Sequence, residues 1–441
     1  MKSNFQTIAV IVSIVFGVFA VLVFSGLIPI GGKNESQYTG TVTVWGTFPA
    51  AAINPIFESI NNSVKTFKAV YVEKNEDTFE QSLIEALASG AGPDAIVFPE
   101  NLIVRQGDKL MPLPFTSLSE SEFRSRFVDE ASILLTPIGA LGVPLAIDPM
   151  VLYYDRDAYN AAGIPEPLSK WIDAASTVTK LTVIDKDNTL MKSGLPLGEY
   201  ENISHAKEII SLLMFQLGNP IVKSSFLTDG GVLQRKLSAV PGIAKGSVNP
   251  AESALRFYTE FANPTKTTYS WNRTMPSSRD AFIGGTAAMY LGFSSEYKEI
   301  AEKNPHLNFD MAVVPQLAAD SGIKATYGRL YSLGVTRTSK NMATSFYLLT
   351  ILSAGDFISA ISKSLDLPPP RRDILAVASP SDAKSEVLHQ SALIAQGFLD
   401  PSPAATDKIW KDAVEAVLSG RLNPAGAASA VQSLFSAMLL R

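Results

Sequence analysis

The chain has 441 residues, of which 46% are hydrophobic, 18% charged and 9% aromatic, and its formal net charge is -5. Because one hydrophobic core stops growing at roughly 250 to 300 residues, a chain of this length is expected to form at least two lobes. The composition excludes a disordered chain, and the weak negative charge argues against nucleic acid as a partner.

The N-terminal residues contain an apolar stretch from Ile8 to Ile30 without a charged side chain. At about 1.5 Å per residue, a helix of this length crosses a hydrocarbon core of roughly 30 Å. The alternative is a cleaved signal peptide, because Val23 and Ser25 are small enough for a processing site before Gly26. We favour a retained transmembrane helix in residues 1–30, since the apolar stretch continues past that site, and a flexible linker at 31–40. The soluble remainder is then expected on the extracytoplasmic side.

The chain contains no cysteine. This excludes disulfides, thiolate metal sites, cysteine nucleophiles and lipid attachment through an N-terminal cysteine. Membrane attachment therefore depends on the polypeptide itself.

Strands and helices alternate in the first part of the folded region. Residues 41–45 and 67–72 read as strands around a helix at 50–61. A second helix begins after Thr78 and ends at Gly90, and GPDAIVF then runs as a strand to Pro99. This alternation predicts a mostly parallel sheet that binds ligands beyond the carboxyl ends of its strands, here residues 46–49, 73–77 and 98–101.

The segment at residues 142–157, GVPLAIDPMVLYYDRD, separates two blocks that each look like half of an α/β receptor. The second block is predicted to be mainly helical, with a hairpin at 181–190 and strands within 287–297, 309–316 and 328–335. Its predicted helices are 157–162, 171–181, 205–217, 251–261 and 277–282.

The order of these segments resembles the bacterial extracellular solute-binding proteins of the sugar-binding, maltodextrin-receptor-like type, which serve ABC importers. The segments that carry the resemblance are VTVWGTF, ALASGAGPDAIVFPEN, VPLAIDPMVLYYDRDAYNAAGIPEP, AFIGGTAAMYLGFSS, FDMAVVPQ and YGRLYSLGV. The resemblance implies an α/β fold with two lobes and a hinge, crossed by the chain near Asp148, 291–294 and 328–331. Lobe 1 would combine 41–147 with 291–327, and lobe 2 would combine 148–290 with 328–441.

The resemblance also implies ligand-binding positions. Asp148 stands where related sugar receptors often place a carboxylate, and the loop after the GPDAIVF strand supplies Phe98, Glu100 and Asn101. Phe293 and Ser294 match a family loop that commonly carries a tryptophan, which is absent here. Aromatic rings that stack on apolar sugar faces would instead come from elsewhere. The candidates are Trp45, Phe48, Trp271 and Tyr331.

Structural roles compete with these assignments. Core packing is about as good an explanation for Trp45, whose neighbours are Val42 and Val44. Trp271 lies in the polar stretch TYSWNRTMPSS and is expected to be exposed, so it is our preferred aromatic platform. Asp148 has the alternative role of capping a turn before Pro149.

No other motif indicates chemistry. The acidic turn at 73–77 reads as solvated carboxylates, and DKDN at 185–188 lacks the glycine and glutamate of an EF-hand. The three histidines show no metal-ligand spacing, and GFSSE lacks the closing glycine of a nucleophile elbow. We therefore expect no catalytic residue, metal or cofactor, although paired carboxylates for glycoside cleavage stay open.

The resemblance implies a membrane-tethered, monomeric solute-binding protein that presents a small ligand, chiefly a carbohydrate, to ABC permease subunits without chemical change. One alternative is a membrane-anchored ectodomain for sensing or adhesion. The other is a surface carbohydrate-active enzyme.

Overall fold

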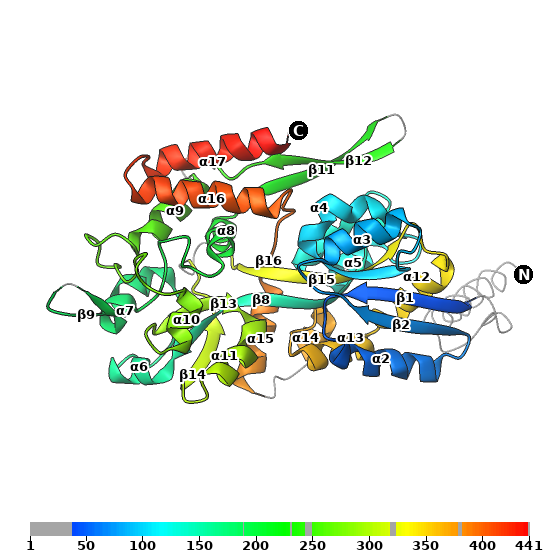
Figure 1. The fold of residues 1–441 in the computed structure, drawn as a ribbon, viewed down its shortest axis with the longest axis horizontal. Coiled ribbons are helices and arrows are strands. Elements are labelled where there is room, and N and C mark those ends of the chain that lie inside the picture. The colour runs from blue at the N-terminus through cyan, green and yellow to red at the C-terminus, as the bar shows by residue number, and fades with distance from the viewer. Residues whose placement is uncertain are drawn as a thin grey trace, which may run out of the picture.

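The computed structural model describes residues 38–187, 189–229, 232–242, 249–317, 323–377 and 382–439. The chain forms two lobes side by side, joined by strands and a connecting segment that pass between them (Figure 1). The predicted transmembrane helix in residues 1–30 and most of the linker lie outside the described residues. Within the described ranges, no single helix is long and apolar enough to cross a membrane.

A large mixed sheet runs through both lobes. Its strand order is β13-β8-β15-β3-β1-β2, with β14 paired to β8 and both β4 and β16 paired to β15. The strands are β1 (Gly40–Gly46), β2 (Phe67–Glu73), β3 (Ala95–Pro99), β4 (Leu110–Met111), β8 (Val143–Asp155), β13 (Met289–Phe293), β14 (Phe309–Val313), β15 (Thr326–Thr336) and β16 (Ala395–Gln396). Strand β1 pairs in parallel with β2 and β3, which confirms the predicted parallel arrangement at this edge.

Two long strands connect the lobes. In β8 only Tyr154 is not fully buried, as expected for a continuous apolar run that is covered on both faces. The first half of β8 pairs with β15 in one lobe, and its second half pairs with β13 and β14 in the other. The predicted seam is therefore a single strand that crosses between lobes near Asp148 and Pro149.

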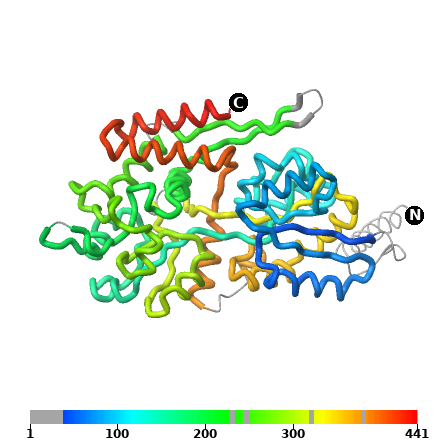
Figure 2. Tube along the Cα trace, in the orientation of Figure 1, coloured from blue at the N-terminus to red at the C-terminus, as the bar shows by residue number. Residues whose placement is uncertain are grey.

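Two separate hydrophobic clusters define the lobes. The first contains Val44, Ile147, Leu333 and Leu348, and we call its part of the chain the first lobe. The second contains core residues of β8, β13 and β14 together with the C-terminal helices, and forms the second lobe. Figure 2 shows the N-terminal part of the chain beside the yellow-to-orange segment that follows β15, both in the first lobe.

The predicted lobe boundaries differ from this division. Residues 291–327 were expected in the first lobe, but Leu291, Met311 and Tyr327 pack in the second cluster. The cause is strand pairing, because β13 and β14 both hydrogen-bond to the second half of β8. After β15 the chain packs in the first cluster as far as Leu375, so this part of the predicted lobe 2 (328–441) also belongs to the first lobe. Leu388 then packs in the second cluster, Ala392, Ala395 and Leu399 pack in the first, and Trp410 packs in the second.

Helices cover the faces of the sheet in both lobes. The predicted helix after Thr78 is confirmed, and Gly90, with a φ of 71°, ends it in the left-handed conformation that glycine adopts readily. The first lobe contains α2 (Ala50–Ser63), α3 (Phe79–Ala88), α4 (Ile103–Gln106), α5 (Glu120–Arg126), α12 (Met342–Leu352), α13 (Gly355–Leu365) and α14 (Arg372–Val377). The second contains α6 (Arg156–Ala161), α7 (Ala174–Leu181), α8 (Ala206–Gln216), α9 (Pro250–Glu260), α10 (Ser278–Ile283), α11 (Tyr297–Lys303), α15 (Ala383–Leu393), α16 (Pro403–Leu418) and α17 (Pro424–Leu439).

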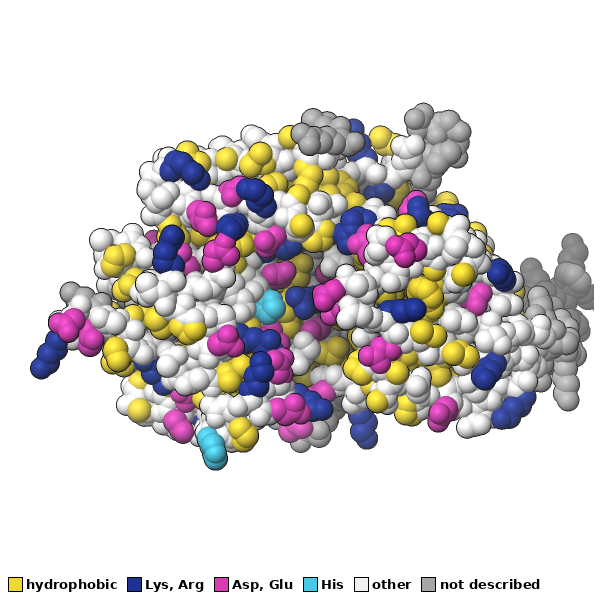
Figure 3. Space-filling view, viewed as in Figure 1, with side chains coloured by type: hydrophobic (Ala, Val, Ile, Leu, Met, Phe, Trp, Pro, Cys, Tyr) yellow, Lys and Arg dark blue, Asp and Glu magenta, His cyan; other side chains and the backbone are white. Residues whose placement is uncertain are grey.

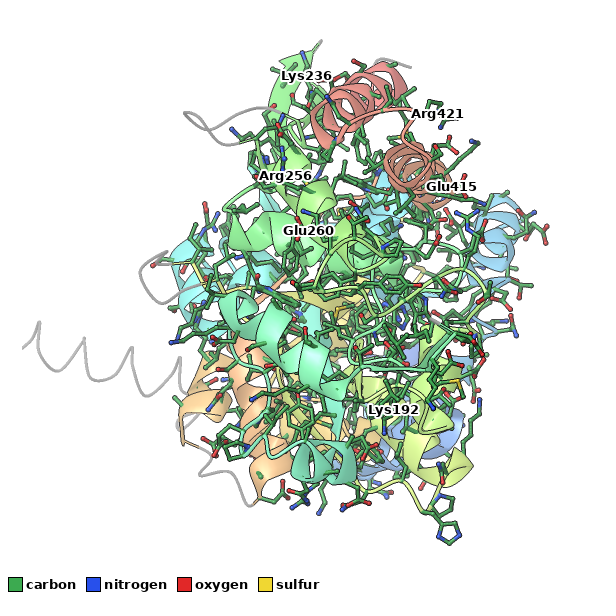
Figure 4. The ribbon with its side chains drawn as sticks, turned by 90° about the vertical axis from the view of Figure 1, so that its left-hand side faces the viewer. Lys192, Lys236, Arg256, Glu260, Glu415 and Arg421 are labelled. Carbon is green, nitrogen blue, oxygen red and sulfur yellow. The ribbon has the colours of Figure 1, made fainter. Side chains whose placement is uncertain are left out.

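Smaller strands complete the fold. Strands β9 (Val183–Ile184) and β10 (Leu190–Lys192) confirm the predicted hairpin, and β5 (Leu113–Pro114), β6 (Leu135–Thr136) and β7 (Gly139–Ala140) form a small sheet in the first lobe. A second hairpin, β11 (Val222–Asp229) with β12 (Val232–Ala239), lies beside α17. Figure 4 faces the second lobe and shows Lys236 on this hairpin, with Arg256 and Glu260 on α9 and Glu415 on α16.

Candidate functional site

A cavity of about 130 Å³ lies between the two lobes. Larger hollows exist, including a groove of about 690 Å³ beside the β11–β12 hairpin. We take the smaller cavity as the candidate site because it contains buried charged side chains, which are rare unless they have a structural or functional role. The space-filling view shows acidic and basic side chains gathered around the furrow between the lobes (Figure 3). The residues that line the cavity are Glu76, Pro99, Glu100, Asn101, Lys207, Glu208, Tyr327, Arg329, Tyr331, Asp400 and Pro403.

Strand β15 supplies the centre of the cavity wall. Tyr327, Arg329 and Tyr331 are two residues apart along this strand, and successive side chains of a strand alternate between its two faces. The three side chains therefore lie on one face of β15, at the place where it passes from lobe to lobe.

The remaining walls come from both lobes. The carboxyl end of β3 supplies Pro99, Glu100 and Asn101, as expected for a sheet of this type. The first turn of α8 supplies Lys207 and Glu208 from the second lobe. A ligand in this cavity would thus contact both lobes at once.

Arg329 has an unusual environment. Its guanidinium carbon lies 3.7 Å from the centre of the Phe293 ring, a cation–π contact. Burial by itself would lower the pKa of Arg329, but Tyr331, Glu208 and other acidic neighbours raise that pKa above its ordinary value. Among the described residues the guanidinium forms no hydrogen bond or ion pair, so its donors are free for a ligand.

Glu100 is deeply buried in the cavity wall, with 4% of its surface exposed, close to the 3% of Asp400. Its Oε2 accepts a hydrogen bond of 2.9 Å from the backbone N–H of Leu330. Burial raises the pKa of the Glu100 carboxyl to about 7, because the charged form loses its hydration. This group therefore changes its protonation state close to neutral pH.

Lys207 and Asp400 form a buried ion pair across the cavity wall. The Lys207 Nζ donates to Asp400 Oδ2 at 3.0 Å. Asp400 also accepts hydrogen bonds from the Thr406 hydroxyl and the Ser402 backbone N–H. Glu208 lacks such partners in the described part of the chain, so its carboxylate, like the Arg329 guanidinium, is free to meet a ligand.

Three of the predicted binding residues line this cavity: Glu100, Asn101 and Tyr331. Phe48 lies behind them, with its ring centre 4.9 Å from that of Tyr331. Phe98 is buried in the core of the first lobe. Trp45 is partly buried at the end of β1, where the Lys74 Nζ lies 3.7 Å from the centre of its ring.

Asp148 connects the crossing strand to the loop after β13. Its Oδ1 accepts hydrogen bonds from the Ser294 hydroxyl at 2.8 Å and from the Ser295 backbone N–H at 3.0 Å. Burial raises the pKa of Asp148, and these hydrogen bonds oppose the increase. Asp148, Phe293 and Ser294 are buried and do not line the cavity. The ring of Phe293 nevertheless packs against the Arg329 guanidinium, which does line it.

The expected exposure of Trp271 is wrong. This side chain has no exposed surface and packs in the core of the second lobe. Its ring N–H donates to the Asn202 Oδ1 at 3.0 Å, and the Asn202 amide in turn donates to the backbone oxygens of Asn272 and Met275. The polar residues around Trp271 are thus bonded to their own lobe, which turns the indole inward.

Sequence reasoning missed several cavity residues. Alternation along YGRLYS, starting from Tyr331, would have pointed to Arg329 and Tyr327. Lys207 and Glu208 carried no signal, because a charged pair in the first turn of a helix is usually solvated. No group of three or more metal-ligating side chains is found in the ranges that the structure covers.

Comparisons with known proteins indicate the family and the fold of this chain. The model of the family described as bacterial extracellular solute-binding protein matches residues 56–387. A protein of Brucella abortus, named only as a binding protein, is 21% identical over 304 residues, which are 67% of each chain. The cyclic α-maltosyl-1,6-maltose binding protein of Arthrobacter globiformis superposes with a TM-score of 0.72 at 16% identity, over 90% of this chain and 98% of that one.

Two further structures have the same fold. The sugar-binding protein MalE of Xanthomonas citri gives a TM-score of 0.71 at 17% identity, covering 91% of this chain and 97% of that one. An ABC transporter solute-binding protein of Thermotoga lettingae, solved with α-D-tagatose, gives 0.63 at 19% identity, covering 91% and 100%. These likenesses show a mixed α/β fold of the periplasmic-binding-protein type. Because the family model matches well over half of this chain, the chain belongs to the bacterial extracellular solute-binding proteins.

Proposed function

We propose that this protein binds a small carbohydrate between its lobes and delivers it unchanged to the permease subunits of an ABC importer. The observation that carries the proposal is the cavity on β15, where the Arg329 guanidinium and the Glu208 carboxylate, both without partners among the described residues, face the same space as two tyrosines. Arginine and carboxylate groups supply the donors and acceptors that sugar hydroxyls require, and tyrosine rings cover apolar sugar faces. The solved relatives whose descriptions name tagatose and maltotetraose support a sugar as the ligand class.

The arrangement of the lobes supports a closing motion. Ligand-binding domains of this general shape close by rotation about a few connecting residues. Here the connections include Asp148 and Pro149 of β8 and Gly328 of β15. Closure would exclude water from the cavity and strengthen the hydrogen bonds of Arg329 and Glu208. The predicted N-terminal helix would hold the protein at the outer face of the membrane as a monomer.

Isothermal titration calorimetry of the full chain in a sugar-free detergent tests this function. The panel contains neutral mono- and oligosaccharides, amino acids, short peptides and polyamines. We expect heat from at least one sugar, and a loss of that heat in Arg329→Met. Arg256→Met is the matched control, because Arg256 is exposed on α9 and, within the described ranges, forms an ion pair with Glu252 alone. Heat from another class with none from any sugar would refute the carbohydrate assignment.

A further inference from the structure

A second buried carboxyl lies behind the cavity wall. Glu130 belongs to the short 3₁₀ helix at Asp129–Leu134 and has 3% of its surface exposed. Neither of its carboxyl oxygens has a hydrogen-bond partner within the described residues. Buried polar groups are nearly always hydrogen-bonded, and a buried charge without partners is costly. A carboxyl group in this position therefore needs an explanation.

Glu130 is pressed against the segments that connect the lobes. A Cβ atom on Gly328 of β15 would lie 2.5 Å from the Glu130 Oε2, and one on Gly397 would lie 2.7 Å from Oε1. Real Cβ atoms do not approach other atoms so closely, so a side chain at either position would require the Glu130 carboxyl to shift. The carboxyl group of Glu130 thus occupies the space beside Gly328 and Gly397, where any other residue would place a Cβ atom.

Glu100 meets the same backbone from the cavity side. Its Cγ lies 3.6 Å from the Cβ position of Gly397, and its Oε2 accepts the N–H of Leu330, two residues after Gly328. The two carboxyls therefore flank one piece of the crossing strand. The Glu100 carboxyl lines the ligand cavity, whereas the Glu130 carboxyl is buried behind the cavity wall.

The charges around this pair are mixed. Burial raises the pKa of both carboxyls, to about 7 for Glu100, and the charge of Glu100 raises the pKa of Glu130 further. Arg329 lowers the pKa of Glu100, whereas Glu208 raises it. The titratable and charged groups that line the cavity with Glu100 are Tyr327, Arg329 and Tyr331 on β15, Lys207 and Glu208 on α8, Glu76 after β2, and Asp400 before α16. Asp148 on β8 lies outside the cavity lining and acts on Arg329 and Tyr331.

We propose that Glu100 and Glu130 form one proton-binding unit that holds at most one negative charge at neutral pH, so that ligand binding at the cavity wall is accompanied by proton exchange. The inference rests on the proposed function, because it takes this cavity as the ligand site. Two carboxyls close together in a dehydrated place do not both ionise readily, and they titrate as a pair. A ligand that drives water from the cavity makes the charged form of Glu100 less stable, so binding near pH 7 takes up a proton.

The pairing is tested without any ligand. The carboxyl carbons of ¹³C-labelled glutamate are followed by NMR through a pH titration of the full chain, and the two signals are assigned from Glu100→Gln and Glu130→Gln. We expect Glu100 to ionise near pH 7, and Glu130 well above the ordinary range of a glutamate carboxyl. In Glu100→Gln the Glu130 midpoint should fall by about 1 pH unit or more, because the neighbouring charge is gone. Ionisation of Glu130 below pH 6, or an unchanged midpoint in Glu100→Gln, would overturn the proposal. Glu130→Met replaces Glu130→Gln if the latter does not fold.

Proton exchange is measured by calorimetry with maltotriose and with D-tagatose in buffers of different ionisation enthalpy. We expect proton uptake at pH 7 in the natural chain and in the surface control Glu260→Gln. We expect none in Glu100→Gln, because the glutamine side chain does not titrate. Binding without proton exchange in the natural chain would contradict the proposal. If neither sugar binds, a sugar that gives heat in the panel experiment replaces them, and if no sugar gives heat, the proposed function fails while the NMR titration still decides whether the carboxyls act as a unit.

Discussion

The buried ion pair between Lys207 and Asp400 gives the sharpest prediction about stability. The side chains are 11% and 5% exposed, and the Nζ to Oδ2 distance is 3.0 Å. Removal of one partner leaves the other charge buried without its partner, which typically costs about 3–5 kcal/mol. Asp400→Asn should reach this range, since the other acceptor of the Lys207 ammonium among the described residues is the Pro403 carbonyl oxygen, at 3.3 Å. Lys207→Met should cost less, because Asp400 keeps the hydrogen bonds from Thr406 and Ser402.

The double variant tests whether the two side chains act together. Lys207→Met with Asp400→Asn removes both charges of this pair, so the loss of unfolding free energy should fall short of the sum of the single losses by about 1–3 kcal/mol. Urea unfolding followed by tryptophan fluorescence measures this, because Trp171, Trp271 and Trp410 all lie in the second lobe. Lys408→Met is the matched control. It breaks an exposed pair with Asp412 on α16 and should change the unfolding free energy by no more than about 0.5 kcal/mol. Additive single losses would refute the coupling.

The remaining predictions concern the core, the cavity and the crossing strand. Trp271→Phe should lower the unfolding free energy by about 1–3 kcal/mol, because the Asn202 oxygen loses its donor. Sugar affinity should not change, and weaker binding at full stability would argue for the abandoned stacking role. Arg329→Met should weaken sugar binding about 10- to 100-fold, at about 1.4 kcal/mol per tenfold, while its melting temperature stays close to that of the natural chain. Gly328→Ala should cost about 1–3 kcal/mol through its clash with Glu130, and Glu130→Ala should recover part of that loss. No recovery would mean that the clash lies elsewhere. Raising the pH from 5 to 8 should destabilise the natural chain relative to Glu130→Gln in urea unfolding, because burial raises the folded-state pKa of Glu130 and the folded form then binds its proton more tightly than the unfolded form. Parallel stability curves for the two proteins would contradict this.

The local pattern of residues was enough for most individual elements. The β-α-β units before Pro99 follow from alternating strand and helix signals with Thr78 and Gly90 at the helix ends. The segment at 142–157 was singled out because it separates two blocks that each look like half of an α/β receptor, and the structure shows β8 within it as a strand that crosses between the lobes. The carboxyl ends of parallel strands likewise predicted Glu100 and Asn101 as cavity residues.

Only the tertiary structure decided how these elements combine. The lobe that contains 291–327 was set by the pairing of β13 and β14 with β8, and pairing between distant strands leaves no trace in local periodicity. Trp271 is buried because Asn202, 69 positions away in the sequence, accepts its ring N–H. Glu208 and Arg329 face one cavity only because α8 and β15 meet there. The sequence by itself determined the strands, helices and family pattern, since these depend on near neighbours, whereas the charges of the binding site depend on contacts that form only when both lobes have folded.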